Sequence, residues 1–209
     1  MKVRAAAELA SIDTYREMKT TKVTPAPMQT QVEGGATLFE MPYYDKKAYL
    51  TQSSQLYLET ALAGLGSVYC IGKSFRAEKS LNVFPATRRH LSEFTHVEAE
   101  LDYIDFADLL DHIGQVVISV IDKVLAEKKS AAQIQLLNPG FHRPLRPFLH
   151  MRYSEAIEWP NTQGPLIPNE EGNRHTFGDD ITEAAECKMT DAINCPIFLS
   201  HFSADAAAA

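Results

Sequence analysis

Two short segments of the sequence, residues 75–78 and 88–98, hold most of the side chains that could do chemistry. The alternation of residue types in each segment predicts a β-strand, in which neighbouring side chains point to opposite faces. An antiparallel pairing of the two strands would gather five polar and aromatic side chains on one face: Arg76, Glu78, Phe94, His96 and Glu98. The opposite face of the second strand is apolar, so we expect the sheet to pack on that side.

Such a face could bind a nucleoside triphosphate, because arginine clamps phosphate with paired hydrogen bonds and an aromatic ring stacks on a base. The whole chain has a net charge of −7, whereas residues 71–90 hold five basic residues against one acid. A basic segment in an acidic protein suits a small phosphate ligand better than a long duplex. The same residues would also fit a charged sheet face with cross-strand ion pairs.

The elements that position these residues can be predicted from periodicity and turn residues. Helices are expected at residues 2–19, 54–65 and 181–191 and after Asp105, and strands at 20–24, 47–50, 68–78, 93–103 and 196–202. The helix after Asp105 has an apolar stripe that we expect to be core: Phe106, Leu109, Leu110, Ile113, Val116, Val117, Val120, Ile121, Val124 and Leu125. Without an alternating βαβ order, the pattern predicts an α+β fold, an antiparallel β-sheet flanked by helices.

The composition is that of an ordinary globular protein, with 45% hydrophobic and 22% charged residues, and 209 residues favour one domain. No apolar run approaches a membrane span, and the N-terminus lacks the apolar stretch of a signal peptide, so we expect a cytoplasmic protein. Cys70, Cys187 and Cys195 have no CxxC spacing, which argues against structural zinc or disulfides, and we assign no metal ligand. Neither of the common glycine-rich nucleotide motifs is present.

The order F-R-x-E, a loop, then R-H-x-x-E-F resembles motif 2 of the class II aminoacyl-tRNA synthetases, here at about residues 71–101. The resemblance implies that Arg76 is catalytic and contacts the α-phosphate of ATP and the carboxylate of the amino acid. It also implies ATP-binding roles for five further residues: Glu78 and Glu93 near the adenine, Phe94 stacked on it, and Arg89 and His90 on the outer phosphates.

Other segments also resemble this family. Residues 2–27 are similar to motif 1, which builds the dimer interface, and residues 29–37 are similar to the loop that closes over the amino acid. There Glu33 would receive the α-ammonium group, although an exposed loop acid is the other interpretation. Gln55, in LTQSSQLYLET, would hold the same ammonium group, and His201 would help to bind the side-chain amide.

The resemblance lies within the aspartyl/asparaginyl branch, and position 58 favours asparagine. Aspartyl members read Q-S-P-Q-L-x-K, with a lysine that pairs with the substrate's side-chain carboxylate. This chain has Leu58 at the lysine position. Leucine cannot neutralise a buried carboxylate, and an unpaired buried charge costs several kcal/mol. Residues 33–37, 56–60 and 95–101 are likewise similar to those of cytosolic eukaryotic asparaginyl members.

The resemblance implies ATP-dependent activation of asparagine and its transfer to tRNA(Asn), with ATP and Mg²⁺ as cofactors and a homodimer formed through residues 2–27. Three features depart from the family pattern: the loop at 79–87 is long, His201-Phe202-Ser203 replaces the usual Phe-Pro, and motif 3 and the anticodon-binding domain are not found in the sequence. An aspartyl enzyme, a related asparagine synthetase and a non-catalytic dimerisation or binding fragment remain alternatives.

Overall fold

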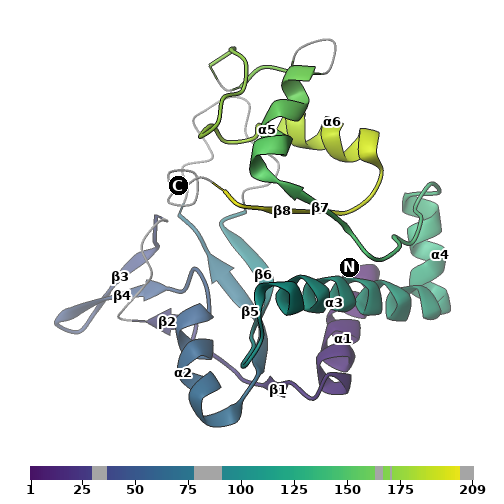
Figure 1. Cartoon of the computed structure of the whole chain (residues 1–209). Helices are drawn as coiled ribbons and strands as arrows, with labels where there is room; N and C mark the ends of the chain where they lie inside the picture. The colour runs from purple at the N-terminus through teal and green to yellow at the C-terminus, as the bar shows by residue number, and fades with distance from the viewer. Residues whose placement is uncertain (30–36, 78–90, 163–166, 170, 203–209) are drawn as a thin grey trace. The chain divides into compact units, whose positions relative to one another are not determined.

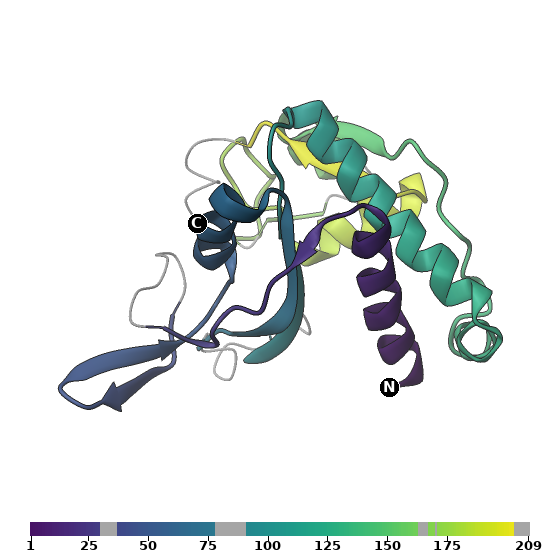
Figure 2. The same cartoon turned by 90° about the horizontal axis from the view of Figure 1, so that it is seen from below.

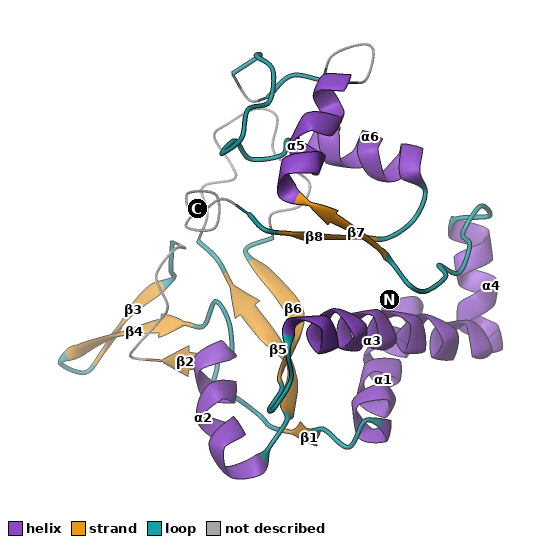
Figure 3. Cartoon of the chain, in the orientation of Figure 1, coloured by secondary structure: helices purple, strands orange, loops and turns teal. Residues whose placement is uncertain are grey.

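The computed structural model describes residues 1–29, 37–77, 91–162, 167–169 and 171–202. These residues form six helices and three small sheets (Figure 3). The contacts divide the chain into two compact units, one of residues 1–109 with 119–139 and one of residues 110–118 with 140–209.

The first unit contains most of the regular structure (Figure 1). Its helices are α1 (Lys2–Glu17), α2 (Gln55–Leu65), α4 (Lys128–Leu137) and most of α3 (Phe106–Ala126). Its strands are β1 (Thr21–Lys22), β2 (Met28–Gln29), β3 (Glu40–Tyr43), β4 (Lys46–Leu50), β5 (Val68–Phe75) and β6 (Glu93–Glu100). The helices and strands that were expected in this unit are therefore present, whereas α4, β2 and β3 were not expected.

Two sheets share these strands. The central sheet has the order β1-β5-β6, in which β1 is parallel to β5 and β5 is antiparallel to β6. The second sheet has the order β2-β4-β3, and its β3–β4 hairpin extends away from the central sheet (Figures 1 and 2). The antiparallel pairing of the two strands that carry the candidate residues is thus confirmed.

Helix α2 packs on the central sheet through a small apolar cluster. Leu58 of α2 is buried with Val68 and Cys70 of β5, and the partly buried Val23 and Ala61 pack against them. Leucine favours the helix and valine the strand, so local preference agrees with the packing at this junction. The cluster fixes the beginning of α2 close to the middle of β5 and β6.

Helix α3 begins as expected, with Asp105 and Asp108 forming a reciprocal capping box. The prediction that its whole apolar stripe is core was wrong. Val124 is buried, but four members of the stripe are among the exposed large hydrophobic residues: Phe106, Leu109, Ile113 and Val117. Helical spacing identifies an apolar face, but it does not show how much of that face its own chain covers.

The second unit is built on a two-stranded parallel sheet of β7 (Leu149–Arg152) and β8 (Ile197–Ser200). It also contains α5 (Tyr153–Thr162) and α6 (Glu183–Ile193). Tyr153 and Ile157 of α5 and Met189 of α6 are buried. The helix expected at 181–191 and the strand expected at 196–202 are therefore present with slightly different ends.

Candidate functional site

The structure describes six of the ten residues that the sequence suggested for the site: Gln55, Leu58, Arg76, Glu93, Phe94 and His201. The other four, Glu33, Glu78, Arg89 and His90, lie outside the described residues. The six described residues lie on or next to β5 and β6, in α2 and just after β8.

The register of β5 and β6 decides which side chains share a face. Cys70 lies opposite Glu98, Gly72 opposite His96, and Ser74 opposite Phe94. Because directly opposed residues in an antiparallel pair point to the same side, these six residues occupy one face. A Cβ at position 72 would lie 3.0 Å from Nε2 of His96, so glycine leaves room for this ring.

Arg76 and Phe94 come together just beyond the end of β5. The Arg76 backbone N–H donates to the carbonyl of Ser92 at 3.1 Å, which holds the chain beside β6. The guanidinium carbon of Arg76 lies 5.6 Å from the centroid of the Phe94 ring, within the range of a cation–π contact. The structure thus places the Arg76 guanidinium beside the Phe94 ring, as the strand pairing predicted, whereas the roles of the two residues in binding a phosphate and a base stay predictions.

Glu93 does not share that face. It lies opposite Phe75, and its carboxylate accepts a hydrogen bond from Nζ of Lys73 at 2.6 Å. Both side chains are about half exposed, so this ion pair contributes at most about 1 kcal/mol. The suggested role of Glu93 in ATP binding stays a prediction.

A buried polar cluster that the sequence analysis did not assign lies further along the two strands. Nδ1 of His96 is 2.5 Å from Oγ of Ser74, and Nε2 is 3.1 Å from Oγ of Ser54 and 3.5 Å from Sγ of Cys70. Burial lowers the pKa of His96, although the nearby Glu98 opposes this shift. Burial also raises the pKa of the Cys70 thiol.

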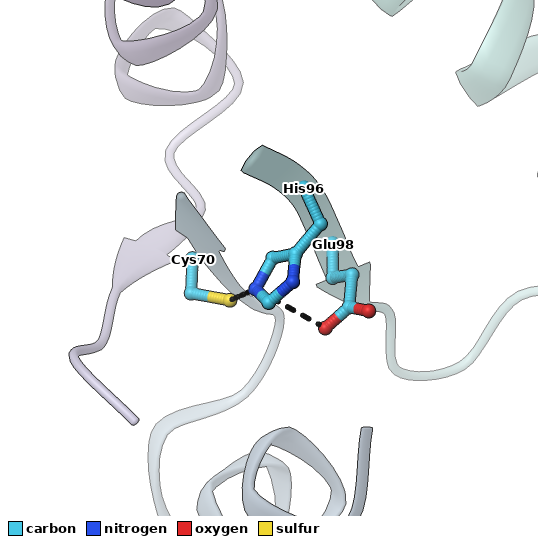
Figure 4. Close-up of side chains that lie close together, drawn as sticks. All are labelled: Cys70, His96 and Glu98. Carbon is cyan, nitrogen blue, oxygen red and sulfur yellow. Dashed lines mark hydrogen bonds and ion pairs between the residues drawn. The ribbon is translucent and has the colours of Figure 1, made fainter. Parts of the chain in front are cut away.

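Glu98 joins this cluster to the beginning of α2. Its carboxylate accepts hydrogen bonds from Oγ of Ser53 at 3.1 Å and from the backbone N–H of Ser54 at 2.6 Å. One carboxylate oxygen also lies 3.5 Å from Nε2 of His96 (Figure 4). Ser54 is the N-cap of α2, where the helix dipole favours a negative charge.

Cysteine spacing could not have found this cluster, because its members come from two strands and a helix cap. Alternation along each strand puts Cys70 and Ser74 on one face and His96 and Glu98 on one face. The missing information was the register, which only the pairing of β5 with β6 supplies.

Gln55 and Leu58 of α2 differ sharply in exposure. Gln55 is exposed, and its amide donates to Glu59 at 3.0 Å. Leu58 is 0% exposed within its cluster with Val68 and Cys70. Leu58 is therefore a core residue. Its suggested part in amino-acid specificity stays a prediction.

His201 belongs to the second unit and follows β8 with a positive φ of 58°. Its Nδ1 is 2.7 Å from Oγ of Ser200, and its ring is 6.4 Å from the ring of His150. The side chain is exposed. Its suggested contact with the substrate amide stays a prediction.

None of the helices in the described residues is long and apolar enough to cross a membrane.

The family model for class II tRNA synthetases (D, K and N) matches residues 1–208, which is nearly the whole chain. The chain belongs to the class II tRNA synthetase family. The α+β fold agrees with this membership.

Among curated members of the family, the chain is 54% identical over 203 residues to the cytoplasmic asparagine–tRNA ligase of Saccharomyces cerevisiae. It is 50% identical over 182 residues to the human cytoplasmic asparagine–tRNA ligase. The alignments cover 97% and 87% of this chain but only 35% and 32% of the two relatives. The chain thus spans about a third of the length of these class II synthetases.

Solved structures of class II synthetases are also similar to this chain, which again covers less than half of each. The asparaginyl-tRNA synthetase of Entamoeba histolytica in complex with asparaginyl-adenylate matches with a TM-score of 0.85 and 40% identity, over 98% of this chain and 43% of that chain. The asparaginyl-tRNA synthetase of Pyrococcus horikoshii complexed with asparaginyl-adenylate matches with a TM-score of 0.79 and 34% identity, over 97% and 44%. An aspartyl-tRNA synthetase from Entamoeba histolytica has a TM-score of 0.71 at 22% identity, over 97% and 37%, which shows the shared fold alone.

Proposed function

We propose that this chain forms part of the asparagine-activating site of a cytoplasmic asparagine–tRNA ligase. The main support is its high identity to relatives of that name, together with its similarity to a structure that holds asparaginyl-adenylate. The contact of Arg76 with Phe94 supports the same proposal, because it brings together the groups suited to a phosphate and a base. The whole reaction would need the remainder of such an enzyme as well.

The reaction would have two steps. A carboxylate oxygen of asparagine attacks the α-phosphorus of ATP, the bond to the bridging oxygen breaks, and pyrophosphate leaves. A terminal hydroxyl of tRNA(Asn) then attacks the carbonyl carbon of the adenylate, and AMP leaves. Arg76 would bind the α-phosphate and stabilise the charge that develops there, while Phe94 would hold the adenine by stacking.

Catalysis of this kind depends mainly on position and charge. Holding both reactants in line removes much of the entropic cost of their encounter, and a guanidinium supplies fixed positive charge without a proton transfer. Gln55 and, in the loop outside the described residues, Glu33 would hold the ammonium group of asparagine. Glu78, Glu93, Arg89 and His90 would complete the ATP site, and His201 would contact the side-chain amide.

We expect Mg²⁺ to accompany ATP in this reaction. Among the described residues, the one cluster suited to a metal is Cys70, His96 and Glu98. Mg²⁺ prefers an octahedron of oxygen ligands, which a thiol and an imidazole do not supply. These residues do not fit Mg²⁺, and we assign no residue to it.

A preference for asparagine over aspartate is supported by the charges near α2. Leu58 offers no cation to pair with a substrate carboxylate, and Glu98 places a carboxylate at the beginning of the helix. A second carboxylate close to Glu98 would meet like-charge repulsion, whereas a neutral amide would not. A homodimer through residues 2–27, which include α1, completes the proposal.

Amino-acid-dependent exchange of pyrophosphate into ATP tests the proposal on the complete protein. We expect exchange with asparagine, much weaker exchange with aspartate, and a loss of at least about a hundredfold in Arg76→Ala, on the scale of one lost transition-state donor. Arg174→Ala is the control, because Arg174 is an exposed arginine in the second unit. Retained exchange in Arg76→Ala would contradict the proposed role of Arg76 at the α-phosphate. Stronger exchange with aspartate would point to an aspartyl enzyme. Formation of free asparagine from aspartate and ammonia would point to an asparagine synthetase.

A further inference from the structure

Three side chains with different donor atoms converge on one point between β5 and β6. Sγ of Cys70, a ring nitrogen of His96 and a carboxylate oxygen of Glu98 all lie within 4.8 Å of one another (Figure 4). Two of the pairs are measured individually. Nε2 of His96 is 3.5 Å from Sγ of Cys70 and 3.5 Å from Oε2 of Glu98. Thiol, imidazole and carboxylate are the three kinds of side chain that bind zinc in proteins.

The distances fit a tetrahedral ion. Bonds of about 2.3 Å to sulfur and about 2.0 Å to nitrogen or oxygen, set at the tetrahedral angle, place the donor atoms about 3.3–3.5 Å apart. The distances from Nε2 of His96 to Sγ of Cys70 and to Oε2 of Glu98 agree with these values, and the sulfur and the carboxylate oxygen lie within 4.8 Å of each other. We propose that Cys70, His96 and Glu98 bind one thiophilic divalent cation of the zinc type.

The surroundings of His96 prepare its ring for this role. Ser74 lies 2.5 Å from Nδ1, so the Nδ1–H tautomer can donate to the serine hydroxyl and leave the lone pair of Nε2 facing Cys70 and Glu98. A hydrogen bond to the other ring nitrogen is the usual way in which proteins orient a metal-binding histidine.

The donor set selects among cations. Sulfur and nitrogen ligands favour Zn²⁺ and Cd²⁺ and disfavour Mg²⁺ and Ca²⁺. Three protein ligands leave a fourth position, which a water molecule or the nearby hydroxyl of Ser54 could take. A cation would enter from the Glu98 side, because the Glu98 side chain is 27% exposed whereas Cys70 is fully buried.

Binding would change one contact of α2. Oε2 of Glu98, which accepts the backbone N–H of Ser54 at 2.6 Å, is the same oxygen that faces Nε2 of His96. A cation at the site would compete with the beginning of α2 for this oxygen. The binding of the metal itself does not depend on the proposed ligase activity, so its test leaves that proposal unaffected.

The test measures binding directly in the protein without ligase substrates. Cys187 and Cys195 are exposed thiols that could bind metal by themselves, so the background protein carries Cys187→Ser and Cys195→Ser. In this background, calorimetry with Zn²⁺ should show one equivalent bound. Titrations in buffers of different ionisation enthalpy should show about one proton released, because the Cys70 thiol must become a thiolate. Cd²⁺ should produce the ultraviolet charge-transfer band of a cadmium thiolate.

Single substitutions in the same background identify the ligands. Cys70→Ala should abolish the cadmium band, and Glu98→Gln should weaken Zn²⁺ binding by at least about tenfold. Glu100→Gln is the matched control on β6 and should leave the affinity unchanged. Absence of one-to-one binding in the background protein would overturn the proposal, whether or not a variant folds. Affinity that is unchanged in both Cys70→Ala and Glu98→Gln would overturn it as well.

Discussion

Replacing Leu58 by alanine tests whether this residue acts through the core. Leu58 is 0% exposed, and alanine in its place would leave a space against Val68 and Cys70. A fully buried leucine that is replaced by alanine costs roughly 3–5 kcal/mol, the sum of the lost transfer free energy and the cost of the cavity. We expect Leu58→Ala to lower the free energy of unfolding by about this amount.

The matched control is Leu56→Ala, on the same helix two residues earlier. Leu56 is 43% exposed, so its replacement removes little buried surface while making the same change in helix preference. Urea unfolding of both variants, followed by far-ultraviolet circular dichroism and extrapolated linearly to water, gives the two free energies. The difference between the variants then isolates the effect of burial.

Equal losses in Leu58→Ala and Leu56→Ala would refute the core assignment and favour a Leu58 that lines an open pocket. The result also bears on specificity. Since Leu58 is enclosed, a lysine in its place would have to bury an ammonium group or lose its proton, at a cost of several kcal/mol. Leu58→Lys is therefore expected to unfold the unit before it could change the amino acid that is activated.

Two further predictions concern the same unit. Burial raises the pKa of Tyr15 to about 12, so the free energy of unfolding should fall as the pH rises from about 10 to about 12. In alkaline unfolding, the Tyr15→Phe variant should show a smaller fall than the unsubstituted protein. Tyr44 is exposed, so the Tyr44→Phe variant should show an unchanged fall. Gly72→Ala would set a Cβ 3.0 Å from Nε2 of His96 and should destabilise the fold by about 1–3 kcal/mol in thermal unfolding. A Cβ at position 64 in α2 would have no atom within 4 Å, so Gly64→Ala should instead stabilise the fold by about 0.5–1 kcal/mol. Destabilisation by both Gly72→Ala and Gly64→Ala would contradict the steric argument.

Local patterns were enough to predict the parts of the fold that depend on neighbouring residues. The alternation in 68–78 and 93–103 predicted both strands, and Asp105 marked the beginning of α3. The two parallel pairings, β1 with β5 and β7 with β8, join strands far apart in sequence. Periodicity carries no information about such partners, so the sequence predicted only an antiparallel sheet.

The candidate site was predicted only in part. The approach of Arg76 to Phe94 followed from strand pairing and residue type. The cluster around His96 was missed because it depends on the exact register and on the cap of α2, which neither strand specifies alone. Burial of Leu58 was also missed, since a lysine position in related sequences suggested a substrate contact rather than a packed one.

The hydrogen bond from Ser54 to Glu98 comes from the main chain, and this limits how the sequence here can vary. Nineteen of the twenty amino acids carry a backbone N–H, so side-chain replacement at position 54 leaves the donor in place; proline alone lacks it. The aspartyl pattern Q-S-P-Q-L-x-K has proline at this position. A proline here would leave one oxygen of Glu98 without its shortest hydrogen bond. This chain therefore differs from that pattern in the backbone donor at position 54 as well as in the side chain at position 58.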